Sequence, residues 1–134
     1  MHAGPKDQVF IFSEYFDISF LEELYNGDLP AAVEVFNSAH IQIVDELGIA
    51  AEYFQKGDIV SVKKVYHKIK PLFGYVGLTE VQDFVHRFEE RCQNAESIGQ
   101  LQAAFEHINE IIGEAIIRIQ QESERLKDHI NKRA

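Results

Sequence analysis

Apolar residues recur along most of the chain at the spacing of a helix rather than of a strand. From Leu29 onward they repeat three or four positions apart, which gathers them on one face of a helix. Alternating runs rich in β-branched residues are few. The pattern therefore predicts an all-α protein with four long amphipathic helices. Their apolar stripes are Leu29, Val33, Phe36, Ile43, Leu47, Ala50 and Phe54; Val62, Val65, Tyr66, Ile69, Phe73 and Val76; Val81, Phe84, Val85, Phe88, Cys92 and Ala95; and Leu101, Phe105, Ile108, Ile112, Ala115 and Ile119.

Capping residues and glycines divide these stripes into separate helices. Three Ser or Thr residues are followed three positions later by Glu or Gln, which is the spacing of a capping box. Two aspartates stand where single N-caps are expected, and glycines follow three of the helices. A further short helix is predicted before residue 28. The capping boxes are Ser19 with Glu22, Thr79 with Gln82 and Ser97 with Gln100; the single caps are Asp28 and Asp58; the glycines are Gly27, Gly57 and Gly77.

Long helices joined by short connections predict an up-and-down antiparallel four-helix bundle with a short extra N-terminal helix. A chain of 134 residues with 46% apolar composition suits one domain with one core. We expect residues 18–128 to form this bundle. Residues 1–17 read as an extension without predicted structure, and the last helix is expected to fray into a charged tail at 129–134.

Composition narrows the class of protein. No run of about 18 apolar residues and no signal peptide is found, so we expect a cytoplasmic protein without membrane contact. The single cysteine, Cys92, suits a reducing compartment and is expected to lie in the core. A net charge of -9 argues against nucleic acid as a partner. A monomer is expected.

One stretch of this acidic chain is basic. Five of the 13 Lys and Arg residues lie between positions 56 and 70, and only Asp58 opposes them there. Such a patch favours an acidic partner or a transferred phosphate. The five are Lys56, Lys63, Lys64, Lys68 and Lys70.

His67 lies within this basic stretch, and the helical wheel places it on the solvent face. It falls roughly 160° from the centre of the apolar stripe of its helix. Pro71 removes the donor that the His67 carbonyl would use, and a mid-helix Gly74 costs about 1 kcal/mol relative to alanine. Two destabilising residues beside one histidine favour an accessible site. Its expected neighbours are Lys64, Pro71 and Gly74 on the same face, Lys63 and Lys70 flanking it, and Tyr75 and Leu78 near one end.

The other histidines give no sign of a metal site. His40 falls within an inward stripe and is expected to be a core or rim residue. His86 faces outward without neighbouring lysines, and surface roles are expected for it and for His2, His107 and His129. No Glu-x-x-His, His-x-x-x-His or Cys-x-x-Cys spacing occurs. A metal site in the bundle is therefore not expected.

The segment around His67 resembles the signature of the histidine-containing phosphotransfer (HPt) domains of two-component phosphorelays. That signature is His-x-Leu-Lys-Gly with a second glycine ten positions after the histidine, and here His67, Ile69, Lys70 and Gly77 match it. The lead-in "DISFLEELYNGD" is also similar, and the resemblance covers about residues 17 to 126. The chain departs from the pattern at Pro71, which replaces the usual glycine, and at the bulky Leu72 and Phe73 after it.

The resemblance implies a phosphate carrier without kinase activity of its own. His67 would accept a phosphoryl group from the aspartyl phosphate of a receiver domain and pass it to another receiver, with Lys70 stabilising the phosphate charge. The implied partners are receiver domains and a hybrid sensor histidine kinase. The chain would bind no cofactor, and Mg²⁺ would sit on the partner receiver. The expected docking residues are Lys63, Lys64, Lys68, Pro71, Gly74, Tyr75 and Leu78.

Two other interpretations remain open at this point. The dimerisation helices of sensor kinases commonly place an acidic residue directly after the histidine. Here that residue is Lys68, and no glycine-rich ATP-binding region follows. A helical adaptor that is never phosphorylated would use the surface of Pro71, Tyr75 and Leu78. Only a carrier accepts phosphate from a receiver without ATP.

Overall fold

Five α-helices and one 3₁₀ turn account for most of the chain in the computed structural model, which describes residues 9–133. None of the helices in this range is both long and apolar enough to cross a membrane. The elements are α1 (Ile18–Tyr25), α2 (Leu29–Gln55), α3 (Ile59–Tyr75), α4 (Thr79–Asn94), the 3₁₀ turn η2 (Ile98–Leu101) and α5 (Gln102–Arg133).

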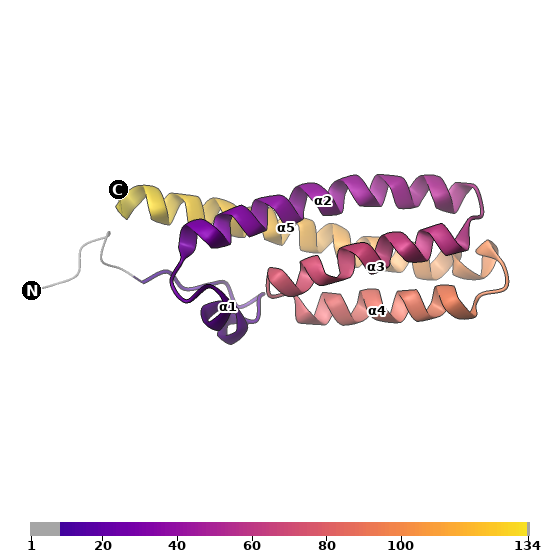
Figure 1. Cartoon of the computed structure of the whole chain (residues 1–134), viewed down its shortest axis with the longest axis horizontal. Coiled ribbons are helices and arrows are strands. Elements are labelled where there is room, and N and C mark those ends of the chain that lie inside the picture. The colour runs from indigo at the N-terminus through magenta and orange to yellow at the C-terminus, as the bar shows by residue number, and fades with distance from the viewer. Residues whose placement is uncertain (1–8, 134) are drawn as a thin grey trace, which may run out of the picture.

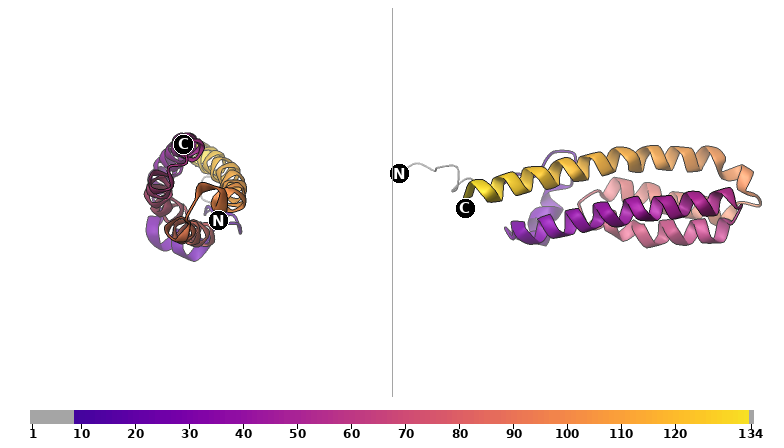
Figure 2. Two further views of the ribbon diagram at one scale, coloured as in Figure 1. Left: turned by 90° about the vertical axis from the view of Figure 1, so that its right-hand side faces the viewer. Right: turned by 90° about the horizontal axis from the view of Figure 1, so that it is seen from above.

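The four long helices run alternately up and down the long axis of the molecule (Figure 1). Each packs against the next in the order α2, α3, α4, α5, and α5 returns to α2. The end-on view shows the four helices around one axis (Figure 2). The short helix α1 lies near the end of the bundle at which α3 passes into α4 (Figure 1). The all-α prediction is confirmed.

Large side chains from all four long helices fill the space between them. Phe36 on α2, Tyr66 and Phe73 on α3 and Ile112 on α5 are fully buried. The Tyr66 ring lies 4.7 Å from that of Phe88 on α4. These residues belong to the predicted stripes, because the apolar spacing of each helix sets which side faces the axis.

The helix caps were only partly predicted. Asp28 and Asp58 cap α2 and α3 as expected, each accepting a hydrogen bond from a backbone N–H three residues on. The three capping boxes were wrong. Asp17, not Ser19, caps α1 by accepting from the Phe20 N–H at 3.2 Å. No side chain caps α4, and Ser97 precedes η2 without a capping bond.

Both ends of the described chain are more ordered than predicted. Within the expected extension, Phe12 and Phe16 are buried, and both rings lie against Phe36. The Ser13 N–H donates to Glu122 Oε2 at 2.7 Å. The predicted fraying of the last helix was wrong: because this N-terminal segment packs along α5, the helix continues to Arg133. Residues 1–8 of the extension lie outside the described range.

Candidate functional site

His67 stands on the outer face of α3, as the wheel predicted. Its side chain is 72% exposed. Its Nδ1 lies 2.7 Å from Oε1 of Glu89, which reaches across from α4. Within residues 9–133, no hydrogen bond engages Nε2. The histidine is thus held at one ring nitrogen and open at the other.

Glu89 is a buried carboxylate, with a side chain only 6% exposed. A buried charge needs a compensating partner. Lys70 provides it, because its Nζ lies 2.7 Å from Glu89 Oε2. That contact is an ion pair without the alignment of a hydrogen bond. Lys70 Nζ also donates to His86 Nδ1 at 3.2 Å. The expectation that His86 has no neighbouring lysine was wrong.

The contact with Glu89 sets the form of the His67 ring that can act chemically. A carboxylate accepts hydrogen bonds, so it selects the tautomer that carries its proton on Nδ1. The lone pair then lies on Nε2, which faces solvent. A neutral imidazole with an exposed lone pair is a competent nucleophile near neutral pH.

Glu89 was not predicted as a site residue, although its position in the sequence carried a signal. It follows Val85 by four residues and precedes Cys92 by three, and both of these side chains are buried. Glu89 therefore occupies the apolar stripe of its helix. A glutamate at such a position requires a partner, and that requirement marks it as a candidate site residue.

The lysines of the basic stretch are more strongly opposed than predicted. Lys68 Nζ lies 2.7 Å from Glu46 on α2, and Lys70 pairs with Glu89. Lys63 donates to Gln93 on α4. Asp58 is the only acidic residue within the stretch itself, but packing brings α2 and α4 alongside α3, and their carboxylates oppose the patch as well. Within the described residues, no carboxylate pairs with Lys64, which is exposed.

The predicted docking face is only partly exposed. Pro71 and Tyr75 lie on the surface, and the Tyr75 side chain is 52% exposed. Leu78 is 3% exposed and belongs to the core, so its assignment to docking was wrong. Gly74 faces α4, where an added Cβ would come within 3.0 Å of Gln82 Nε2. The helical wheel misplaced Leu78 because α3 ends at Tyr75, so Leu78 lies in the turn toward α4 and not on the helix.

Gly77, the second glycine of the signature, has a structural role. It adopts a φ of 73°, a region that favours glycine. An added Cβ would lie 2.7 Å from Leu21 Cγ on α1. Its carbonyl also accepts from the Asp17 N–H at 2.8 Å. Gly77 thus joins the α3–α4 turn to the start of α1.

A hollow of about 620 Å³ opens beside His67 toward the start of α3. Val60, Lys63 and Lys64 line it from α3, and Gln93 lines it from α4. Cys92 lies in its wall but is only 2% exposed, and burial raises the pKa of the Cys92 thiol to about 11. The prediction that Cys92 is a core residue is confirmed.

The remaining histidines of the described range lie away from this site. His40 is half-buried at a bundle edge, as predicted, and His107 is exposed. His129 is half-buried instead of exposed, and its ring lies 5.4 Å from that of Phe10. His2 is outside the described range. Among residues 9–133, no three His, Cys, Asp or Glu side chains group closely enough to hold a metal ion.

Comparison with protein-family models matches residues 29–129 to the Hpt domain. Searches of curated proteins and of solved structures found no match. The matched range holds α2 to α4 and nearly all of α5, and it includes His67, Lys70 and Glu89. The chain therefore belongs to the Hpt domain family, whose members carry phosphoryl groups on a histidine in phosphorelays and are not kinases.

Proposed function

We propose that this chain is a phosphorelay carrier that accepts a phosphoryl group on Nε2 of His67 from a receiver aspartate and returns it to another receiver. The observation that carries the proposal is the geometry of His67. Its Nδ1 is bound by buried Glu89 at 2.7 Å, and its side chain is 72% exposed. The reacting nitrogen is therefore accessible to a partner that docks on α3.

The chemical step needs little rearrangement within this chain. The Nε2 lone pair attacks phosphorus, an N–P bond forms, and the P–O bond to the receiver aspartate breaks, releasing its carboxylate. No proton has to leave Nε2, because the ring proton lies on Nδ1. The ring becomes positively charged, and the Glu89 carboxylate beside Nδ1 stabilises that charge. Return of the group to a second receiver reverses these bond changes.

Lys70 acts on this step in two ways. It compensates the charge of Glu89 through the 2.7 Å ion pair, which keeps the carboxylate placed against His67. Its positive charge, one helical turn from His67, also favours the incoming phosphoryl group. Lys64 and Lys68 add weakly to the positive electrostatic potential around His67. We expect Mg²⁺ to come with the acidic site of the receiver.

The receiver is proposed to dock over the exposed part of α3 around His67. Pro71 and Tyr75 offer apolar surface there, and Lys63, Lys64 and Lys68 offer charge complementary to an acidic partner. A hybrid sensor kinase is the expected source of the phosphate. The carrier is expected to act as a cytoplasmic monomer.

The test mixes the protein with Mg²⁺ and several pre-phosphorylated receiver domains, without ATP. Acid-labile, alkali-stable label on the wild type and none on His67→Gln is the expected result. Circular dichroism would establish that both proteins are folded. Absence of label from every receiver on a folded wild type would contradict the proposal and favour an adaptor that is never phosphorylated.

A further inference from the structure

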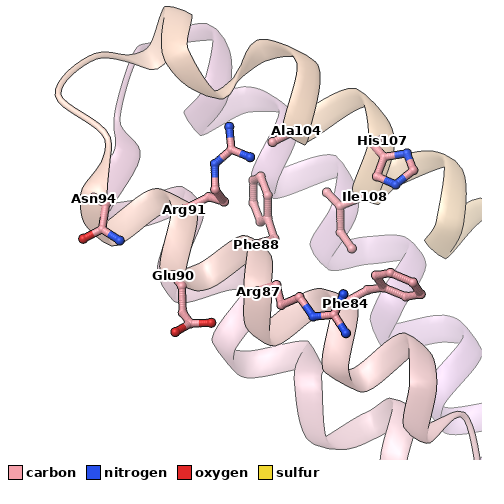
Figure 3. Close-up of a pocket in the computed structure, with 9 residues that line it drawn as sticks. All are labelled: Phe84, Arg87, Phe88, Glu90, Arg91, Asn94, Ala104, His107 and Ile108. Atoms are coloured by element: carbon pink, nitrogen blue, oxygen red, sulfur yellow. The ribbon is translucent and has the colours of Figure 1, made fainter.

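The seam between α4 and α5 holds two open hollows on the side of α4 away from α3. The first, of about 510 Å³, has a mainly apolar floor formed by Phe84 and Phe88 from α4 and by Ala104 and Ile108 from α5 (Figure 3). The second, of about 500 Å³, lies between residues 14–17 and the start of α4, and it reaches Val81, Phe84 and, on α5, Ile111. Phe84 lines both hollows, so they lie end to end along α4. We call the two hollows together the α4–α5 seam.

The floor of the α4–α5 seam is held from below. Phe88 and Ile108 are each 3% exposed. The Phe88 ring lies 4.7 Å from that of Tyr66 and 6.3 Å from that of Phe105, both packed beneath it. Phe84 is only half-buried and leaves apolar surface open to solvent. A partner that covers this surface gains the free energy of removing it from water, and the rigid floor loses little entropy.

The two ends of the seam carry opposite charge. Arg87 and Arg91 stand at the first hollow with His107 opposite, and Glu90 is the one acidic residue that lines it (Figure 3). The Arg87 guanidinium lies 5.1 Å from the centre of the Phe84 ring. It also forms an ion pair with Asp83 one turn earlier on α4, but both side chains are exposed, so solvent screens that pair and leaves Arg87 open to a partner. Between residues 9 and 133, no carboxylate comes within ion-pair distance of Arg91. The second hollow is lined instead by Glu14, Asp17 and Glu80.

The length of the seam matches a helix. From Val81 to Asn94, α4 rises about 20 Å at 1.5 Å per residue, or nearly four turns. A third helix can lie between two others by placing its side-chain ridges in their groove. Apolar side chains one turn apart on that third helix would contact Phe84 and Phe88. Charged side chains beside them would contact the oppositely charged ends of the seam.

We propose that the α4–α5 seam binds an amphipathic helix of a partner protein, whose acidic end lies against Arg87 and Arg91 and whose basic end lies against Glu14 and Glu80. Arg87 and Arg91 each stand two positions from Glu89, roughly 160° around the helix axis. The seam and the His67 site therefore occupy opposite faces of α4 and can be filled at the same time. Such a contact would tether the protein without covering His67, and it does not depend on phosphate transfer.

The test titrates the ¹⁵N-labelled protein with a synthetic helical peptide of about 14 residues, enough to span the seam. The peptide has leucines at helical spacing, glutamates along its first half and lysines along its second. A control peptide keeps the leucines and replaces every glutamate by lysine. Expected are amide shifts at Phe84, Ala104 and His107, with about tenfold weaker binding of the control peptide, because its basic half meets Arg87 and Arg91.

Charge reversal on the protein sharpens the test. The double variant Arg87→Glu, Arg91→Glu should bind the peptide with glutamates and lysines about tenfold more weakly than the wild type does. It should bind the control peptide, in which lysine replaces every glutamate, more tightly than the wild type does. The matched control, Lys56→Glu with Lys132→Glu, changes net charge equally at exposed positions away from the seam and should leave both affinities unchanged. Thermal melts would verify that each variant is folded.

Three outcomes would overturn the proposal: shifts outside the seam, equal affinity for the two peptides, or no change of preference in the Arg87 and Arg91 variant. Concentration-dependent dimerisation that this variant abolishes would identify a second copy of the chain as the occupant and also overturn it. Each readout is binding or sedimentation, so failure here leaves the phosphate-carrier proposal untouched.

Discussion

His67 Nδ1 and Glu89 Oε1 lie 2.7 Å apart, although one residue is exposed on α3 and the other is buried on α4. The exposed ring gains its orientation from a group that solvent hardly reaches. Glu89 is itself placed by Lys70, which belongs to α3 and lies one turn beyond the histidine. The pair therefore depends on the register of two helices.

Replacing Glu89 by glutamine tests what its charge contributes. The amide side chain would keep the shape and one acceptor but lose the negative charge beside the ring. Charge-assisted hydrogen bonds exceed neutral ones by about 1 to 1.5 kcal/mol, so the rate of phosphate acceptance should fall about tenfold. The measurement is rapid-quench transfer from a phosphorylated receiver. Glu90→Gln, at the exposed neighbouring position, should leave the rate unchanged.

Replacing His67 by glutamine separates function from stability. The side chain is 72% exposed, and exposed substitutions usually change stability by less than about 0.5 kcal/mol. His67→Gln should therefore lose all phosphate acceptance while its urea midpoint stays near that of the wild type. A large drop in the midpoint would show that the His67 ring supports the fold, contrary to its exposure.

Lys70 is expected to matter for both stability and transfer. Lys70→Ala leaves the Glu89 carboxylate buried without its ion pair, which should cost about 2 kcal/mol and slow transfer more than Lys127→Ala does. Combining Lys70→Ala with Glu89→Gln should restore part of the stability, because the uncompensated charge is gone. Urea unfolding of the single and double variants measures this coupling. Strictly additive losses of stability would show that the ion pair between Lys70 and Glu89 does not contribute to stability.

The sequence predicted those features that depend on one helix at a time. Apolar spacing placed His67 outside and Tyr66 inside, because the direction of a side chain follows from its position along a regular helix. It did not predict the partner of His67, because Glu89 meets it only through the packing of α4 on α3. Gly74 was interpreted as a means of access, whereas it admits the Gln82 side chain from α4.

Local motifs failed where tertiary contacts compete with them. The predicted capping box of Thr79 and Gln82 does not form, and Gln82 lies against Gly74 instead. At the C-terminal end, charge suggested a frayed tail. The structure instead continues α5 to Arg133, and the Phe10 ring lies 5.4 Å from that of His129. No local pattern indicated that the N-terminal segment packs there.

Gly77 should be the least replaceable glycine of the described chain. An alanine there would have to adopt a φ of 73° and place its Cβ 2.7 Å from Leu21 Cγ. The left-handed conformation and the overpacking together should cost about 3 kcal/mol in unfolding free energy. Gly48→Ala is the matched control, because its added Cβ meets no atom within 4 Å in a helix. That change should stabilise the protein by up to about 1 kcal/mol.

Cys92 provides a prediction of reactivity against pH. Burial raises the pKa of its thiol from 9.0 to about 11, so at pH 8 the folded protein holds little thiolate. Iodoacetamide reacts with the thiolate, and labelling at pH 8 should therefore be much slower in the native protein than in urea. Cys92→Ala provides the blank. Equal labelling rates in the two states would show that the hollow beside His67 opens readily to the Cys92 sulfur.

The same shift makes part of the folding stability depend on pH. Well below pH 9 the thiol is almost fully protonated in both states and adds little dependence. Between pH 9 and about 11 the unfolded chain loses the proton that the folded protein retains, so the unfolding free energy must fall as pH rises. The loss should level off at about 3 kcal/mol above this range. Buried tyrosines also weaken the fold in alkali, so the contribution of Cys92 is the difference between wild type and Cys92→Ala in urea unfolding at each pH. Parallel curves for the two proteins would mean that the Cys92 thiol titrates alike in both states.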